Sequence, residues 1–378
     1  MNLNLSINAL KKYLNILTTS VMPVIAITLH GCAAGTTATN VYAYISDFGG
    51  NRLLKCLVNV NNGQLANCQY VNQPNSLNQP TGVAVNNGYL YVNNSAFNTS
   101  NPVSSTAKCI INGGISTLSD CIYYTIGIVN PIGFTISTIN GNTYAYIANY
   151  DSSTSSHAKP GSVTKCRVNS SDGVLNNCST MSASSISLQN NPTPEVVTIN
   201  TNASNGPVAY ITDQQNAGYS FCNVNEIDGS FRSCSFNTLA NSGVDSITPI
   251  GPRQMTIIGN YAYFALSGNT GGQTTQYASG YTRCSVNGVD GSLSGCSSQQ
   301  TAPGQLNSPT GIAYNNGYVY ITNENGVPDT SIGYSYTMCN VNEAGLLANC
   351  SNQVPQGIAQ VNYGDAGVYL TYITFNNQ

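Results

Sequence analysis

The sequence predicts an all-β fold, a six-bladed β-propeller of four-stranded antiparallel blades. Three observations point to it: cysteine pairs that recur along the chain, two strand patterns that recur between them, and a composition suited to strands and tight turns. Of the 378 residues, 7% are charged, 36 are Gly and 25 are Tyr. Four short strands cannot bury a core alone, but radially repeated sheets can.

Twelve of the 13 cysteines form local pairs, which leaves Cys32 as the odd one. The first members of the pairs recur at intervals of 53, 57, 56, 62 and 55 residues. The pairs are Cys56/Cys68, Cys109/Cys121, Cys166/Cys178, Cys222/Cys234, Cys284/Cys296 and Cys339/Cys350. Four of them bracket the pattern C-x-V-N-x-x-[DN]-G-x-[LF]-x-x-C, whose Asn-Gly or Asp-Gly step is typical of a β-hairpin turn.

Hairpin geometry predicts that each pair is a disulfide within one blade. A three-residue turn with a glycine bulge places residue i opposite residue i+12, which is the spacing of the first five pairs. The sixth pair is one residue closer, and its turn is also one residue shorter, so we expect a two-residue Ala344-Gly345 loop. Six such bridges indicate an oxidising compartment. The second pair has a less regular turn at residues 113–116.

Two strand patterns precede each hairpin. One begins at a proline, and these prolines are Pro80, Pro131, Pro194, Pro252, Pro309 and Pro355. The other is tyrosine-rich, as in YVYITN before residue 324. The chain starts with a tyrosine strand at residues 41–47, so we expect the C-terminal residues 355–360 to complete that blade and close the ring. A further tyrosine strand at residues 367–374 either pairs within the closing blade or begins a seventh blade.

The pairing of a P-x-G-[IV]-A strand with a Y-[IV]-T-[DN] strand resembles the YVTN and NHL classes of propeller repeat. The stretch ISDFGGNR at residues 45–52 is especially similar to an NHL repeat. The resemblance covers almost all of residues 41–376. It implies a propeller and leaves the activity open, because these families include lactonases, lyases and binding platforms.

The first 31 residues resemble a bacterial lipoprotein signal peptide. Lys11 and Lys12 precede an apolar stretch, and the Leu29-His30-Gly31-Cys32 sequence that follows is similar to a lipobox. His30 departs from the usual small residue, so an ordinary signal peptide and an uncleaved anchor are the alternatives. We expect a signal peptide at 1–31, a lipidated Cys32 with a linker at 32–40, and one propeller domain at 41–378. The resemblance implies an outer-membrane lipoprotein that faces the periplasm or the cell surface.

Two rings of side chains are the candidate ligand site. The tyrosine strands end at Asp47, Asn94, Asn149, Asp213, Leu266 and Asn323, which we expect near the channel mouth. Such oxygens suit a hard cation or sugar hydroxyls, but the same residue types also cap turns. The residues that follow the prolines form a second ring of Thr81, Ile132, Glu195, Arg253, Thr310 and Gln356.

Glu195 and Arg253 are notable in a chain that otherwise avoids charge. They fall in consecutive blades, so they either form an ion pair that locks two blades or mark the polar end of a pocket. The resemblance to lactonases implies a metal-binding acid near such a strand. Glu195, Asp213 and Asp47 are therefore the candidate metal ligands. We expect no cofactor, with Ca²⁺ or another divalent cation as the alternative.

The side-chain inventory favours binding over catalysis. With 11 Lys and Arg against 14 Asp and Glu, the chain lacks a basic face for nucleic acid. His157 lies in a Ser-rich loop, no cysteine is left as a nucleophile, and no catalytic triad is recognisable. We expect a monomeric, non-catalytic platform that binds a protein or glycan partner through its face loops and touches the membrane through its lipid. The alternatives are a metal-dependent lactonase-like hydrolase in the central channel and a structural surface protein.

Overall fold

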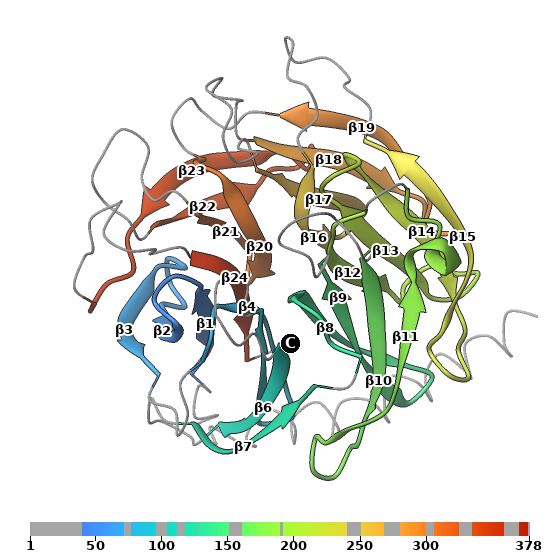
Figure 1. Ribbon diagram of the computed structural model, residues 1–378. Helices are drawn as coiled ribbons and strands as arrows, with labels where there is room; N and C mark the ends of the chain where they lie inside the picture. Colours follow the sequence, from blue (N-terminus) through green and yellow to red (C-terminus); the bar gives the residue numbers. More distant parts are fainter. Residues whose placement is uncertain are drawn as a thin grey trace, which may run out of the picture. The chain divides into compact units, whose positions relative to one another are not determined.

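The computed structural model describes residues 40–71, 77–95, 104–111, 118–125, 127–150, 161–189, 192–239, 251–267, 280–299, 306–324, 335–358 and 370–376. Residues 41–378 form one compact unit. Its described strands make six four-stranded antiparallel sheets around an axis (Figure 1), and each innermost strand contacts the innermost strands on both sides of it. The predicted six-bladed propeller is confirmed. The signal segment, Cys32, His157 and the turn at 113–116 lie outside the described residues.

In each blade, the first strand named is the innermost and the last is the outermost. The closing blade contains β24 (Leu370–Phe375), β1 (Tyr42–Asp47), β2 (Arg52–Val58) and β3 (Leu65–Tyr70). The next two contain β4 (Pro80–Asn86), β5 (Tyr89–Asn94), β6 (Ser105–Ile111) and β7 (Leu118–Tyr124), then β8 (Pro131–Ile139), β9 (Asn142–Asn149), β10 (Ser162–Val168) and β11 (Leu175–Ser182).

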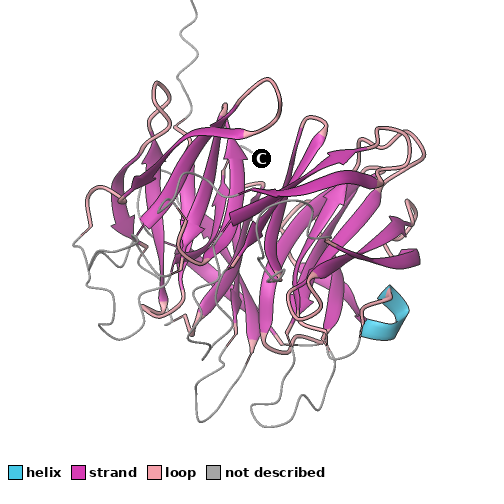
Figure 2. Cartoon of the chain, turned by 90° about the horizontal axis from the view of Figure 1, so that it is seen from above, coloured by secondary structure: helices cyan, strands magenta, loops and turns pink. Residues whose placement is uncertain are grey.

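The remaining three blades have the same order. They contain β12 (Pro194–Asn200), β13 (Val208–Asp213), β14 (Gly218–Val224) and β15 (Phe231–Thr238); β16 (Pro252–Ile258), β17 (Tyr261–Leu266), β18 (Gly280–Val286) and β19 (Leu293–Gln299); and β20 (Pro309–Asn315), β21 (Tyr318–Asn323), β22 (Ser335–Val341) and β23 (Leu347–Gln353). A 3-10 helix, η1 (Ala183–Ile186), follows β11 at the rim of the ring (Figure 2). No helix in the described residues is long and apolar enough to span a membrane.

The ring is closed by both ends of the chain, as predicted, but by a different strand. β24 pairs with β1, with Ile373 opposite Ile45, and forms the innermost strand of the closing blade. The expectation for residues 355–360 is wrong, because the described part of that segment is a turn whose Gln356 bonds to the backbone of β3. The choice follows from burial: every residue of β24 is buried, and Leu370 and Phe375 are 0% exposed. β24 thus completes the closing blade, and the ring has six blades with no seventh begun by this strand.

The six predicted disulfides are present, one in each blade, with Cα atoms 4.0 to 4.1 Å apart. Their hairpins differ in detail from the prediction. In the first, Asn59 N–H donates to Gln64 O, so residues 60–63 form a four-residue loop. A bulge then shifts the register by one residue and returns Cys68 to the place opposite Cys56. Structural disulfides persist in oxidising compartments, so the protein is exported.

The two cysteines of a bridge are alike in the sequence pattern but differ in burial. The first member lies on the third strand of its blade and is at most 1% exposed in all six blades. The second member lies on the outermost strand and is only half-buried in five blades, at Cys121, Cys178, Cys234, Cys296 and Cys350. Cys68 is the buried exception, because its backbone N–H donates to Gln356 O and the 356–357 turn covers it. Each bridge therefore ties a buried strand to the strand at the rim of the ring.

The bulge depends on one residue in each blade that adopts a positive φ. It directly precedes the second cysteine, and the residues are Asn67, Asp120, Asn177, Ser233, Gly295 and Asn349. Asn, Asp and Gly adopt this left-handed conformation most readily. The sixth hairpin keeps the bulge and shortens its loop to residues 343–345, which explains its 11-residue spacing.

Five of the six hairpins are also held by the blade before them. The second-strand tyrosine donates its buried hydroxyl to the carbonyl oxygen of the turn glycine in the next blade, and the pairs are Tyr91 to Gly173, Tyr146 to Gly229, Tyr210 to Gly291, Tyr263 to Gly345 and Tyr320 to Gly63. A side chain would clash here: a Cβ on Gly173 would lie 2.7 Å from the Tyr91 oxygen. The turn glycine is therefore required by its φ of 68° and by its neighbour.

Candidate functional site

The channel has two different ends because all six innermost strands run in the same direction. Five of them start at the predicted prolines, after the connection from the previous blade, and we call this the loop end. β4 and β20 finish at tight Asn-Gly turns, such as Asn87-Gly88, and we call this the turn end. The two predicted rings lie toward the loop end. The loops at 96–103, 151–160 and 268–279 are outside the described residues.

The asparagines of the second-strand ring hold the entrance of the innermost strand. Each side-chain carbonyl accepts a backbone N–H from the segment that leads into that strand: Asn78 N–H to Asn94 at 3.3 Å, Val129 N–H to Asn149 at 3.3 Å and Asn307 N–H to Asn323 at 3.1 Å. Their amide nitrogens donate to hydroxyls of the third strand, such as Ser105 and Thr337. These groups are used within their own blades. Leu266 gives the ring an apolar member.

The two aspartates of this ring are also engaged locally. Asp213 accepts the backbone N–H of Thr193 at 3.1 Å and the side-chain amide of Asn216 at 2.8 Å. Burial raises the pKa of Asp213, and these hydrogen bonds oppose the rise. Asp47 accepts Arg52 Nε at 2.9 Å and the N–H of Gly50 at 2.9 Å. Both carboxylates therefore close turns at the end of a second strand.

The predicted metal ligands do not fit a divalent cation. In the described residues, no three His, Cys, Asp or Glu side chains come together in a possible metal site. Glu195 Oε1 lies 3.1 Å from Arg253 Nη1, so a cation beside this carboxylate would meet a guanidinium. Asp47 is paired with Arg52 in the same way. We therefore derive no chemistry through a metal.

The structure brings Glu195 and Arg253 together, as their positions in consecutive blades predict. The Glu195 side chain is 1% exposed, whereas that of Arg253 keeps 20% of its surface exposed. Desolvation raises the pKa of the Glu195 carboxyl, and the Arg253 guanidinium opposes the rise. The pair thus consists of a buried acid and an arginine whose side chain remains partly exposed.

Two further side chains complete the arrangement around Arg253. Oriented with its oxygen toward the guanidinium, the Gln214 amide accepts from Nε and Nη2 at 3.2 and 3.1 Å and donates to Glu195 at 2.9 Å. Glu324, directly after β21, has Oε2 at 3.8 Å from Arg253 Nη2 and a side chain that is 29% exposed. We name Glu195, Gln214, Arg253 and Glu324 the charged cluster. It combines one positive and two negative groups.

Tyr372 of β24 reaches the charged cluster from the opposite side of the ring. Its hydroxyl lies 3.1 Å from the backbone oxygen of Glu195 and 3.4 Å from Oε2. In the order of the six blades, β24 and β12 are three places apart, so this side chain crosses the axis. Burial raises the pKa of Tyr372 well above its usual value, and the negative charge of Glu195 adds to the rise. Tyr372 therefore spans the axis at the level of Glu195.

The other residues of the proline ring connect neighbouring innermost strands. Thr81 Oγ1 donates to Pro131 O at 2.7 Å, and Thr310 Oγ1 donates to Thr371 O at 3.0 Å. Ile132 is buried in the core. Gln356 was expected in this ring but lies beside β3, and Thr371 of β24 takes that place. The sequence did not point to Glu324, Gln214 or Tyr372. Their one signal was position, since Gln214 and Glu324 each follow the last residue of a tyrosine strand.

Comparisons with known proteins place the fold among propellers. No family model matches the sequence, and no curated protein matches it. Similar solved structures include two putative 6-phosphogluconolactonases, from Bacteroides fragilis (14% identity, TM-score 0.53, covering 90% of this chain and 99% of that one) and Bacteroides uniformis (12%, 0.53, 89% and 99%). Another is the periplasmic gluconolactonase of Pseudomonas aeruginosa (13%, 0.53, 89% and 99%). At these identities, the likeness is one of fold.

These comparisons correct the expectation of a non-catalytic platform. The similar propellers are described as lactonases, which is the alternative that the sequence left open. The side-chain inventory found no catalytic triad, and it gave little weight to carboxylates because the chain has only 14 Asp and Glu. The loop end instead carries an arginine and acids.

Proposed function

We propose that this chain is a lactonase-like hydrolase that opens a small cyclic ester of a sugar acid at the loop end of its channel. The observation that carries the proposal is the charged cluster, in which a partly exposed Arg253 is held by hydrogen bonds beside a second partly exposed group, the acid Glu324. The similar solved propellers named as lactonases support the choice of reaction. The substrate class comes from their names and is part of the proposal.

Arg253 supplies the electrostatic part of the reaction. Water attack on a lactone carbonyl places negative charge on the carbonyl oxygen, and a fixed guanidinium next to that oxygen stabilises the charge. Glu195 and Gln214 hold three of the guanidinium nitrogens, so the group needs little reorganisation when the charge develops. Glu195 is buried and acts through Arg253, which makes it a positioning residue.

Glu324 supplies the general base. Its carboxylate accepts a proton from the attacking water while the water oxygen bonds to the carbonyl carbon. The bond between that carbon and the ring oxygen then breaks, and the ring oxygen takes the proton from Glu324. The product is the open hydroxy acid, and the enzyme returns to its starting state. Glu324 Oε2 lies 3.8 Å from Arg253 Nη2, so the base and the oxyanion partner stand side by side and would approach one bound lactone from the same side.

Lactone opening by the purified, disulfide-intact protein tests the proposal. Glucono-lactone and its 6-phosphate are the probes, and acid release is measured at constant pH with the spontaneous rate subtracted. Relative to the wild type, we expect Arg253→Gln to lower kcat/KM about 10²-fold or more. Glu324→Gln should lower it by about 10² to 10⁴.

Arg52→Gln is the matched control, because Arg52 also pairs with a buried carboxylate but stands in the closing blade beside Asp47. It should keep the wild-type rate. A wild-type protein that does not exceed the spontaneous rate on either lactone, or an Arg253→Gln variant as active as the Arg52→Gln variant, would contradict the proposal.

We further propose that the protein is held at the outer membrane by a lipid on Cys32. The support is the lipobox-like sequence after an apolar segment and the even number of cysteines that remain without Cys32. Incorporation of a labelled fatty acid into the wild type and not into Cys32→Ser is the expected result. Equal labelling of both proteins, or of neither, would contradict it.

A further inference from the structure

A cavity of about 460 Å³ opens at the turn end of the channel, apart from the charged cluster. All six innermost strands line it, and Val196 and Gln254 mark its inner limit next to Glu195 and Arg253 in the chain. Its volume lies within the range of roughly 300 to 1,000 Å³ that small-molecule sites occupy. Space of this size fits one small ligand.

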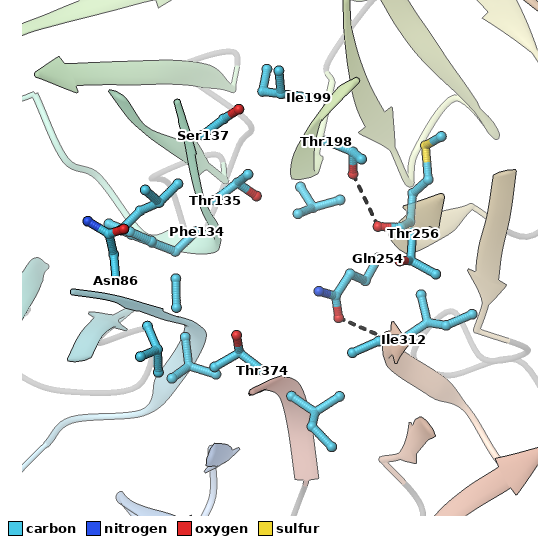
Figure 3. A pocket seen from close by; sticks show the side chains of 18 of the residues that line it. Asn86, Phe134, Thr135, Ser137, Thr198, Ile199, Gln254, Thr256, Ile312 and Thr374 are labelled. Carbon is cyan, nitrogen blue, oxygen red and sulfur yellow. Dashed lines mark hydrogen bonds between the residues drawn. The ribbon is translucent and has the colours of Figure 1, made fainter. Parts of the chain in front are cut away.

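The cavity wall is uncharged along the whole described lining, although it is rich in hydroxyl and amide groups. Desolvating a charged ligand here would leave its charge without a partner, which is costly. The walls combine apolar side chains such as Ile199 with polar groups from several blades (Figure 3). This chemistry favours a neutral ligand that has both apolar faces and hydroxyl groups.

Gln254 offers a donor whose orientation is fixed. Its Oε1 accepts the backbone N–H of Ile312 at 2.8 Å, and only the oxygen of the amide can do so. The amide nitrogen is therefore on the other side, and Figure 3 shows it directed into the cavity. A donor held in place by the backbone of the next blade costs little entropy when it binds a ligand.

Two threonine hydroxyls add groups that can both donate and accept. Two other threonines of the wall, Thr135 and Thr198, occupy the same strand position in neighbouring blades, but their hydroxyls donate to Val197 O and Met255 O. Within the described part of the chain, the hydroxyls of Thr256 and Thr374 form no hydrogen bond, and Figure 3 shows the Thr374 oxygen facing the cavity. They remain available to a ligand or to water.

We propose that the turn-end cavity binds an uncharged monosaccharide or similar polyol. Gln254 Nε2 donates to a ligand oxygen, Thr256 and Thr374 bond to its hydroxyls, and the apolar face of the sugar packs against the half-buried Ile199. The site is separate from the proposed lactonase chemistry, because the described lining of the cavity includes no residue of the charged cluster and begins at Val196 and Gln254, one residue beyond Glu195 and Arg253.

Titration of the full-length protein with methyl hexosides and methyl pentosides, followed by calorimetry and ligand-observed NMR, tests the site. The matched uronic acids are the charged probes. At least one neutral glycoside should bind, and its uronic acid should bind at least about tenfold more weakly because of the desolvation cost. Each of Thr256→Val and Thr374→Val removes one hydroxyl at nearly constant volume and should weaken binding about three- to tenfold.

Thr238→Val, on the exposed outermost strand β15, is the control for the threonine substitutions and should bind as the wild type does. Arg253→Gln should also retain sugar binding, even where it abolishes lactone opening, which separates the two proposals. Failure of every neutral glycoside to bind at millimolar concentration would mean that the cavity holds water alone and would overturn the inference. Equal binding of uronic acids, or unchanged affinity in both valine variants, would overturn it as well.

Discussion

At the scale of single residues, the protein buries a charged side chain near the channel axis, where desolvation of a charge costs the most free energy. Glu195 is 0% exposed, and a buried carboxylate is tolerated when a fixed partner stands next to it. Three residues from other parts of the chain surround the Glu195 carboxylate: Arg253, Gln214 and Tyr372. Such a pair contributes little net stability compared with an apolar pair, so the proposed role of Arg253 in lactone opening does not compete with a large role in folding.

The raised pKa of Glu195 predicts a pH dependence of stability. Between the ordinary value of 4.5 and the higher value in the folded protein, the folded state keeps a proton that the unfolded state has released. The free energy of unfolding should therefore fall as pH rises through that window, and Glu195→Gln should remove this part of the slope. Urea unfolding at a series of pH values measures it, with the exposed acid variant Glu343→Gln as control. An unchanged slope in Glu195→Gln would contradict the assignment.

The tyrosines that donate to the turn glycine of the next blade give a second prediction at this scale. Tyr263 is 0% exposed, donates to Gly345 O at 2.7 Å, and has its pKa raised to about 12 mainly by desolvation. Tyr263→Phe deletes the hydroxyl and leaves the glycine carbonyl without that donor, so we expect a loss of about 1 kcal/mol in the free energy of unfolding. Tyr314→Phe, at a tyrosine that is 37% exposed, should cost less than half as much. Equal losses in chemical denaturation would show that the hydroxyl contact contributes nothing.

At the scale of elements, the hairpin with its disulfide is the part that sequence predicts best. Spacing and turn residues are local information, and they sufficed to pair all twelve cysteines. The exact turn was missed because two arrangements give the same 12-residue separation: a three-residue turn, or a four-residue loop with a bulge at residues such as Asn177. The positive φ that decides between them has no signature in a single repeat, since Asn, Asp, Ser and Gly all occupy the position.

Removal of one bridge should weaken its blade. Cys166→Ala with Cys178→Ala frees a loop of about a dozen residues, for which the chain-entropy model gives a loss of about 3 kcal/mol. Hydrogen exchange should accelerate first in the β10–β11 hairpin, whose Gly173 accepts the Tyr91 hydroxyl. Mass spectrometry of the intact variant provides the control that the other five bridges are formed. Unchanged exchange and stability would mean that the bridge is dispensable.

At the scale of the whole molecule, β24 links the closure of the ring to the site. The same six residues complete the closing blade and place Tyr372 beside Glu195. Sequence could not choose between residues 355–360 and this strand, because both satisfy the local strand pattern and the choice depends on which fills the space inside the finished ring. The same limit hid Glu324, Gln214 and Tyr372, which reach the charged cluster from positions far apart in the chain.

Closure predicts that β24 is sensitive to truncation of its side chains. Phe375 is 0% exposed, and its ring centroid lies 5.0 Å from that of Tyr320 in the neighbouring blade. Phe375→Ala should lower the free energy of unfolding by about 3 to 5 kcal/mol, because the space between two blades is left empty. Tyr314→Ala, which removes an exposed aromatic ring, should cost less than about 1 kcal/mol. Similar costs for the two variants would mean that β24 does not hold the ring together.

In the proposed function, the Arg253 guanidinium is the group that stabilises the charge formed during lactone opening. The most direct test is the rate of glucono-lactone opening by Arg253→Ala in the presence and absence of added guanidinium. We expect that wild-type protein exceeds the spontaneous rate, that Arg253→Ala loses about 10²-fold or more, and that guanidinium restores part of the loss. Wild-type protein without activity above the spontaneous rate, or an alanine variant that keeps full activity, would contradict it.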